Sequence, residues 1–232
     1  MPDTENHGPL KTLQTGAYPV VFMFAATFLT TGILVGIARL TASRVEANRQ
    51  VLVEKSVMMA LGLDMDDRMP PSRIHQMFLD RVAPPVEASA GAYRLMEADR
   101  VTAYAVPFEG RGFWDTIKGF VGVRADGQTM LGIAFYQQSE TPGLGGEIVK
   151  PHFLNQFKGL ELLTGVPALR FRPVGAATAA GEVHAITGAT QTCTRLEWIM
   201  SDALDRWRER MGLKPATDRE HAADAEGRGV EP

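Results

Sequence analysis

The sequence predicts an α+β protein: a single N-terminal transmembrane helix, followed by a domain in which helices flank a twisted, mainly antiparallel sheet. Three observations favour this fold class. Residues 17–38 form a strongly apolar run without a charged side chain. Short apolar segments between residues 102 and 136 are separated by turn residues, which is typical of hairpins. An amphipathic helical pattern follows at 189–211.

The composition narrows the functional classes. The chain has 232 residues, enough for one sizeable domain with extensions. Its formal net charge of −3 implies no broad basic face, so we expect no nucleic-acid partner. The single cysteine, Cys193, excludes an internal disulfide framework and is expected as a small packed residue on a helix. The five histidines show no metal-ligand spacing, so we expect no metal site.

We expect residues 1–16 to form an N-terminal tail and residues 17–39 a transmembrane helix. An apolar helix of this length spans a hydrocarbon core of about 30 Å, and Tyr18 suits the membrane interface. The alternative is a cleaved signal peptide, but Ala38-Arg39-Leu40 is a poor match for the small-residue cleavage site of such a peptide. We therefore favour an uncleaved anchor.

The charges that flank this segment bear on its orientation. Lys11 is the only basic side chain before it, whereas Arg39, Arg44 and Arg49 follow it closely. Taken alone, the positive-inside rule places the C-terminal side in the cytoplasm.

The folded domain is expected over residues 42–213. Residues 42–63 carry apolar and charged side chains at helical spacing, so this helix continues from the membrane segment and packs on the domain. A short helix is expected at 72–82, before Pro84-Pro85. Residues 214–232 are rich in alanine, glycine, proline and charge, and are expected to be a disordered tail.

Strands are expected at 102–108, 120–123 and 130–136. Asp126-Gly127 between the last two predicts a hairpin turn. Pro107 places the end of the first strand at a sheet edge or a turn, because proline cannot donate a ladder hydrogen bond.

The C-terminal part of the domain is expected to contain a short helix at 153–163 and strands at 169–171 and 183–186. A tight turn at Thr187-Gly188 then leads into a helix from about Ala189 to Met211, with Thr187 as its N-cap. Trp198 and Trp207 are expected to be packing residues on this helix. Its apolar stripe is Leu196, Ile199, Met200, Leu204, Trp207 and Met211.

The start of this helix is the most informative stretch of the chain. The first turn of a helix has free N–H groups and a partial positive charge, so it binds phosphate well. Thr190 and Thr192 add hydroxyls, which can accept a phosphoester bond. The alternative is a capped helix with no ligand. A glycine-rich loop, Gly143-Leu144-Gly145-Gly146, lets a flat ligand approach the backbone closely, or is simply a long turn.

These motifs resemble the covalent-FMN subunits of respiratory redox pumps. The nearest resemblance is to the C subunit of the sodium-translocating NADH:quinone reductase; the alternative is the related G subunit of the Rnf-type ferredoxin:NAD oxidoreductase. The resemblance covers nearly the whole chain, and the doubled glycine followed by Glu147 favours the sodium-translocating reductase. The segments that carry it are the anchor, the helix around Ala47 to Leu63, Gly110 to Trp114, Lys118 to Phe120, Glu140 to Ile148, and Thr187 to Thr190.

The resemblance implies an FMN-binding domain in which Thr190, the last residue of a Ser/Thr-Gly-Ala-Thr motif, carries FMN through a phosphoester. A flavin transferase makes this bond with FMN drawn from FAD. Thr187, Gly188 and Ala189 complete the motif. Thr192 is the local alternative, since the residues alone do not separate the two hydroxyls.

Further cofactor contacts are implied near the flavin ring. A loop is expected beside the ring, with backbone amides that stabilise its reduced form. The loop residues are Glu140, Thr141, Leu144, Gly145 and Gly146. Trp114 and Lys118 are expected to approach the ring as well, with packing in a strand as the alternative for Trp114.

The resemblance also implies a cellular setting. The chain is expected to be a single-pass protein of the bacterial inner membrane, with its FMN domain on the periplasmic side, where the transferase works. Its partners are the lipid bilayer and the other subunits of a membrane complex. Within that complex it relays electrons and has no catalytic residue of its own, so it is an enzyme only as a non-autonomous subunit of an NADH:quinone reductase. The alternatives are a membrane-anchored flavin-binding sensor and a structural subunit without covalent flavin.

One residue departs from the attachment motif. An acidic residue usually stands three places before its Ser/Thr, and here that position is His184. A histidine is neutral or cationic near neutral pH, so its interaction with a transferase would differ from that of an acidic residue.

Overall fold

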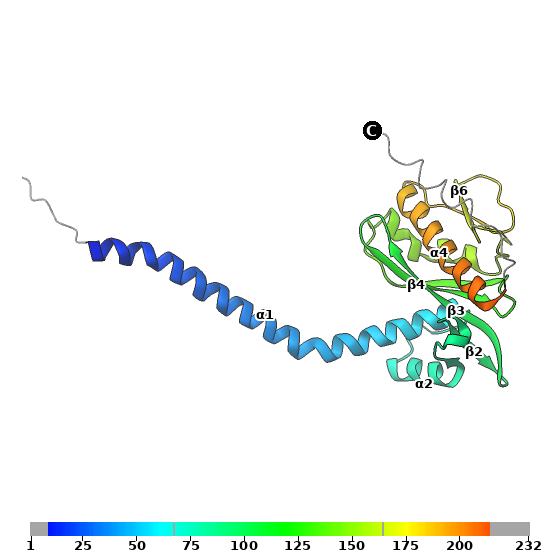
Figure 1. The fold of residues 1–232 in the computed structure, drawn as a ribbon, viewed down its shortest axis with the longest axis horizontal. Coiled ribbons are helices and arrows are strands. Elements are labelled where there is room, and N and C mark those ends of the chain that lie inside the picture. Colours follow the sequence, from blue (N-terminus) through cyan, green and yellow to red (C-terminus); the bar gives the residue numbers. More distant parts are fainter. Residues whose placement is uncertain (1–8, 67, 164, 214–232) are drawn as a thin grey trace, which may run out of the picture. The chain divides into compact units, whose positions relative to one another are not determined.

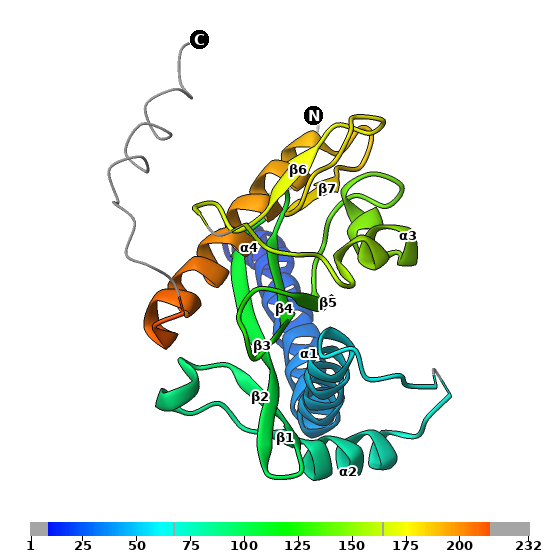
Figure 2. The ribbon, with the colours of Figure 1, turned by 90° about the vertical axis from the view of Figure 1, so that its right-hand side faces the viewer.

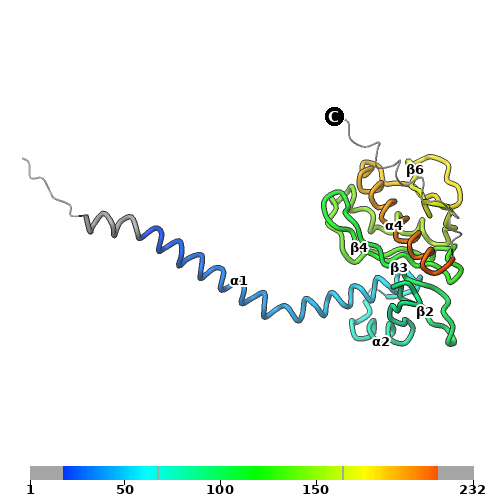
Figure 3. The backbone as a smooth tube through the Cα atoms, in the orientation of Figure 1, coloured from blue at the N-terminus to red at the C-terminus, as the bar shows by residue number. Residues whose placement is uncertain are grey.

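The computed structural model describes residues 9–66, 68–163 and 165–213 (Figure 1). The tail expected at 214–232 lies outside these residues, as do residues 1–8 of the expected N-terminal tail. The chain divides into two compact units, one up to Gln50 and one from Val51 onward. Figure 3 traces the backbone through both, and every strand of the described residues lies in the second unit.

Helix α1 (Pro9–Ala60) accounts for all the described structure of the first unit. Within the described residues it is the one helix long and apolar enough to cross a membrane, with a mean hydropathy of 2.2 in the apolar window. The side chains of this apolar window are exposed; Phe28, for example, is 82% exposed. The hydroxyl of Thr30 donates to the Ala26 carbonyl at 2.5 Å, so this polar group is satisfied without water.

The helix begins earlier than expected. Residues 9–16, which we placed in the N-terminal tail, are helical from Pro9 onward. Proline is favoured in the first turn of a helix, where its missing N–H would have no helical partner.

A five-stranded sheet forms the centre of the second unit, in the order β1-β2-β3-β4-β5 with every neighbouring pair antiparallel. The predicted hairpin joins its last two strands: the Asp126 carboxylate accepts the Gln128 N–H at 2.7 Å, and Gly127 takes a φ of 69°. This sheet, with the helices around it, confirms the predicted α+β fold. The strands are β1 (Val82–Ala83), β2 (Tyr93–Glu97), β3 (Arg100–Arg111), β4 (Thr116–Arg124) and β5 (Met130–Gln137).

Helix α4 (Thr190–Met211) covers one face of the sheet (Figure 2). The main core lies between them and contains Phe153, Phe157 and Leu196, all fully buried. At the far end of α4, the buried Arg208 donates to the carbonyls of Gly127 and Leu163, each at 2.8 Å. These bonds fasten the helix to the β4–β5 turn through Gly127 and to the segment after η3 through Leu163.

The opposite face of the sheet is covered by the last turns of α1 and by α2 (Pro71–Arg81). Val57, Met58 and Ala60 of α1 are fully buried there. The expectation that this helix continues from the apolar segment and packs on the domain is therefore correct.

The remaining elements differ from their expected bounds. The helix predicted at 153–163 is limited to α3 (Pro151–Leu154) and the 3-10 turn η3 (Asn155–Phe157), because Lys158 turns extended and Gly159 has a φ of 74°. Strands β6 (Arg170–Arg172) and β7 (Glu182–His184) pair in parallel. Two further 3-10 turns are η1 (Glu87–Ser89) and η2 (Gly145–Val149).

Pro107 and Trp198 also differ from their predicted places. Pro107 lies inside β3 rather than at its end; it is nevertheless on an edge, because β2 reaches only Ala105. Trp198 is 66% exposed and is not a packing residue, whereas Trp207 is buried and donates its indole N–H to the Ser89 carbonyl at 3.2 Å.

We expect Gly122→Ala to destabilise the second unit by about 1–3 kcal/mol, because its methyl group would overlap the Ala60 carbonyl of α1. Gly132 is the matched control: it pairs with Gly122 across β4 and β5, and its added carbon would stand 3.4 Å from the same oxygen. Urea unfolding of both variants measures the difference. Equal losses in the two would contradict close packing of α1 on β4.

Candidate functional site

Thr190 is the first residue of α4, and its side chain is exposed. The turn before it is closed by the Ala189 N–H, which donates to the Ile186 carbonyl at 3.1 Å, with Gly188 at a φ of 78°. The predicted N-cap, Thr187, is therefore wrong. Gly188 turns the chain, Ala189 takes the cap position without a side-chain cap, and Thr187 is left exposed in the turn.

Cys193 holds this turn against the helix. Its amide donates to the Ala189 carbonyl at 2.9 Å, and its sulfur accepts the Ile186 N–H at 3.3 Å. Burial raises the pKa of the Cys193 thiol. It is the packed cysteine that the sequence indicated.

The two candidate threonines occupy different environments. Thr192 is 4% exposed, and its hydroxyl donates to Glu140 Oε2 at 2.7 Å. Thr190 faces solvent. A hydroxyl must be reachable to accept a phosphoryl group, so the structure distinguishes two residues that the sequence did not.

Glu140 is a buried carboxylate that joins three segments of the chain. It is 5% exposed; one oxygen accepts the Thr192 hydroxyl, and the other accepts the Trp114 N–H at 3.1 Å. It therefore fixes the start of α4 and the β3–β4 turn to its own loop. These two hydrogen bonds offset the free-energy cost of removing the Glu140 carboxylate from water.

Two glycines make room for this carboxylate. A side-chain carbon on Gly112 would overlap Glu140 Oε1, and one on Gly145 would overlap the Thr192 hydroxyl. Arg195 of α4 donates to the Gly112 carbonyl at 3.0 Å, which adds a second tie between the helix and the β3–β4 turn.

The loop from Glu140 to Ile148 is folded on itself. The amides of Leu144 and Gly146 both donate to the Thr141 carbonyl, at 3.1 and 2.9 Å. These two amides are therefore paired within the loop, and the expectation that the loop amides stabilise a reduced flavin stays a prediction. Gly145 and Gly146 are buried, whereas the Leu144 side chain is 44% exposed and lies against Gly188.

Trp114 and Lys118 have different relations to the loop. Trp114 is 63% exposed beside Phe113, and its amide is held by Glu140, so it is not packed in a strand. Lys118 lies on β4, and its ammonium pairs with Glu109 of β3 at 2.7 Å. Trp114 thus adjoins the Glu140 loop, whereas the ion pair of Lys118 is made within the sheet.

A pocket of about 410 Å³ lies on the other side of the first turn of α4. It is formed where β6 and the residues after it face α4. Its lining residues are Phe171, Arg172, Pro173, Val174, Ala185, Ile186, Thr187, Gly188, Thr190, Cys193, Thr194 and Glu197. Sequence reasoning missed the wall from Phe171 to Val174, because no motif marks it. The spacing of Thr190, Thr194 and Glu197 on one helical face was the available signal.

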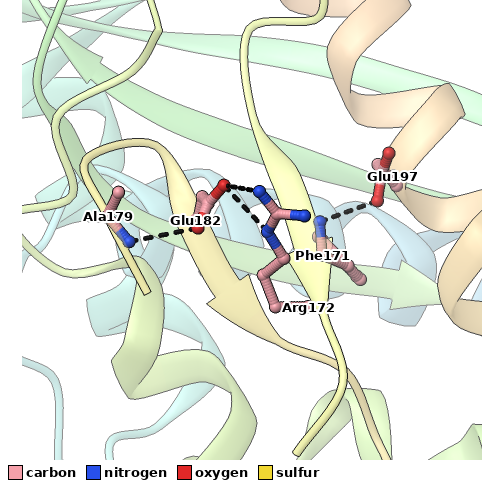
Figure 4. Close-up of polar contacts among 5 residues, drawn as sticks. All are labelled: Phe171, Arg172, Ala179, Glu182 and Glu197. Carbon is pink, nitrogen blue, oxygen red and sulfur yellow. Dashed lines mark hydrogen bonds and ion pairs between the residues drawn. The ribbon is translucent and has the colours of Figure 1, made fainter. Parts of the chain in front are cut away.

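Glu197 is a half-buried carboxyl group in this pocket. It accepts the Phe171 N–H at 2.7 Å, a bond that Figure 4 shows between α4 and β6. Burial is the main cause that raises the pKa of Glu197 above its ordinary value of 4.5.

Side chains of β7 hold the segment that continues the pocket wall, residues 173–181. Arg172 donates to Glu182 Oε1 at 2.8 Å, and the other Glu182 oxygen accepts the Ala179 N–H at 3.1 Å (Figure 4). The Arg172 guanidinium lowers the pKa of Glu182. His184 contacts the same segment through Nε2, which lies 2.9 Å from the Ala176 carbonyl oxygen.

Comparison with known proteins finds relatives of the part of the chain that contains this site. Residues 112–205 match the family described as FMN-binding domain, a span that includes Trp114, Glu140, His184 and Thr190. The chain is 34% identical over 126 residues to the C subunit of the Na(+)-translocating NADH-quinone reductase of Vibrio anguillarum, a match that covers 53% of this chain and 48% of the relative. With the corresponding protein of Pasteurella multocida it shares 42% identity over 98 residues, covering 41% and 38% of the two chains. The chain thus spans about half the length or less of these curated relatives.

Two solved structures share the fold. The crystal structure of the C subunit of the Na(+)-translocating NADH-quinone reductase from Parabacteroides distasonis aligns with a TM-score of 0.63 at 19% identity, covering 76% of this chain and 98% of that one. NqrC from Shewanella oneidensis aligns with a TM-score of 0.59 at 19% identity, covering 72% and 100%. The resemblance to the C subunits of this reductase is therefore confirmed.

We expect Glu140→Ala to lower the free energy of unfolding by about 2–4 kcal/mol, because it strands the buried Thr192 hydroxyl and Trp114 N–H and leaves a cavity. Glu147→Ala, in the same loop, is the matched control. Chemical denaturation measures both. A loss for Glu140→Ala no larger than that for Glu147→Ala would show that the carboxylate does not hold the three segments together.

We expect Glu197→Gln to become more stable relative to the wild type as the pH rises above 4.5, the ordinary pKa of this group. Because the folded-state pKa is raised, the folded chain holds this proton to higher pH than the unfolded chain, so ionisation destabilises the fold as pH rises. The amide oxygen of glutamine still accepts the Phe171 N–H. Unfolding free energies measured from pH 4 to 7 test the trend, and a difference independent of pH would refute it.

Proposed function

We propose that this chain is an electron-carrying subunit of a membrane respiratory complex of the Na+-translocating NADH:quinone reductase type, with FMN attached covalently to Thr190. One observation carries the proposal: Thr190 begins α4 and is exposed, while the hydroxyl of the buried Thr192 is bonded to Glu140. The FMN-binding match over residues 112–205 and the similarity to the C subunits of that reductase support it.

The residues at the site fit a flavin phosphate. The first turn of α4 has the N–H groups and the positive dipole end that a phosphate prefers, and Thr190 is the first residue of that turn. The pocket on one side and exposed Leu144 and Trp114 on the other provide apolar surface for a planar ring. When bound, FMN supplies the redox chemistry, and the protein supplies attachment, orientation and electrostatics.

Attachment requires a group transfer to Thr190. The hydroxyl oxygen forms a bond to the FMN phosphorus of FAD, the phosphoanhydride bond breaks, and AMP leaves. The hydroxyl proton passes to a base of the flavin transferase. No electron is transferred in this step. The chain's own contribution is to hold the Thr190 hydroxyl in an exposed turn that is closed by Gly188 and fastened by Cys193.

The proposal includes a cellular setting. The apolar part of α1 anchors the chain in the bacterial inner membrane by a single pass, and the FMN domain lies on the periplasmic side with the transferase. The other subunits of the complex are its partners, and the chain acts as an oxidoreductase only within that complex. Its similarity to the Vibrio anguillarum protein supports a place in such a complex. The periplasmic side is proposed against the bias of the flanking arginines.

Co-expression with a flavin transferase tests the attachment. We expect flavin fluorescence on the denatured protein band, with the mass increment of an FMN phosphoryl group, and we expect Thr190→Ala to abolish both. Thr192→Ser, which keeps the hydroxyl on Glu140, is the matched control and should retain the flavin. Thermal unfolding of each variant confirms that it is folded.

Two results would overturn the proposal. Flavin that persists in folded Thr190→Ala would move the attachment elsewhere. A wild-type chain without covalent flavin, in cells whose transferase modifies a known acceptor, would favour a structural subunit. Co-purification of partner proteins then separates a pump component from a membrane-anchored flavin sensor.

A further inference from the structure

The residue that departs from the attachment motif, His184, does not point at the attachment residue. Its ring Nε2 lies 2.9 Å from the Ala176 carbonyl oxygen, in the segment 173–181 that continues the pocket wall. A carbonyl oxygen only accepts hydrogen bonds, so Nε2 carries the hydrogen and donates it. The backbone of His184 is fixed separately: its N–H donates to Gln156 Oε1 at 2.8 Å, and its carbonyl accepts from Gln156 Nε2 at 3.2 Å.

The hydrogen bond from His184 affects the pocket through one turn of the backbone. The Ala176 N–H donates to the Pro173 carbonyl at 3.1 Å, which closes a turn from Pro173 to Ala176. Pro173 and Val174 of this turn line the same pocket as Thr190. The position of Ala176 therefore sets the position of the wall opposite the acceptor hydroxyl.

Glu182 makes a second tie to the same segment. It stands two residues before His184 on β7, and its carboxylate accepts the Ala179 N–H while it binds Arg172 (Figure 4). Arg172 pairs in register with His184 across the parallel strands β6 and β7. One carboxylate and one ring N–H thus fasten the segment at two points.

An acidic residue at position 184 would disturb both ties. An aspartate has no hydrogen to donate to the Ala176 carbonyl, and its charge would face that carbonyl oxygen. It would also stand in register with Arg172 and compete with Glu182 for the guanidinium. The Ala176 tie would be lost, and the pairing that orients Glu182 toward Ala179 would weaken.

We propose that His184 is a positioning residue for flavin attachment: it holds the turn Pro173–Ala176 as a wall of the pocket beside Thr190, and in this chain an acidic residue cannot replace it. The inference rests on the proposed function. In this proposal His184 shapes the pocket beside the acceptor Thr190, and FAD is the co-reactant that enters that pocket.

The test compares His184→Asp, His184→Ala and His184→Gln in the full chain, with a flavin transferase and FAD. Glutamine keeps an N–H donor at similar reach, so His184→Gln should be modified within about twofold of the wild-type rate. Loss of a positioned hydrogen bond should lower kcat/KM for the acceptor about tenfold in the other two variants. His152→Asp makes the same charge change at an exposed position of α3 and should be modified at the wild-type rate.

Hydrogen exchange of the segment 173–181, measured without flavin, is the second readout. We expect faster exchange at the Ala176 amide in His184→Asp and His184→Ala, faster exchange at the Ala179 amide in His184→Asp, and wild-type exchange in His184→Gln. Modification of His184→Asp at or above the wild-type rate overturns the inference, as does exchange in His184→Asp that matches the wild type. A wild-type chain that takes no flavin refutes the proposed function instead, while exchange still tests the role of His184.

Discussion

The site depends on one buried carboxylate. Glu140 is removed from water, so its two oxygens require donors, and they find them in the Thr192 hydroxyl and the Trp114 N–H. The loop, the β3–β4 turn and the first turn of α4 are therefore held at fixed positions. The glycines at 112 and 145 follow from the same constraint, since a side chain at either would occupy the space of these bonds.

The first turn of α4 therefore lies between a closely packed loop and a pocket. On one side, the Glu140 loop is closely packed, with its amides turned inward and Leu144 outward against Gly188. On the other side lies a pocket whose wall is held by single side chains of β7. The packed side fixes the helix and buries Thr192. The pocket side leaves Thr190 approachable and depends on His184 and Glu182 for its shape.

Elements with strong local patterns were predictable from the sequence. The apolar run, the hairpin at Asp126-Gly127 and the helix that ends at Met211 all have short-range causes. Thr187 was misplaced because cap preference ignores how Gly188 closes the turn. Exposed Trp198 and buried Thr192 depend on which face of α4 meets the sheet, which a helical period alone does not state. The pocket was not predictable, because β6 and α4 meet only in the folded chain.

The exposure of Thr190 has a consequence for how the cofactor is retained. A noncovalent ligand would be lost from a pocket that is open to solvent when the concentration of free ligand is low. The phosphoester proposed at the first residue of α4 would make retention depend on tether length, with the effective concentration of the ring set by a few rotatable bonds. The residues that line the pocket then need not provide a high binding affinity for the flavin. The pocket walls, which His184 and Glu182 help to hold, could then differ in ways that alter access to the flavin.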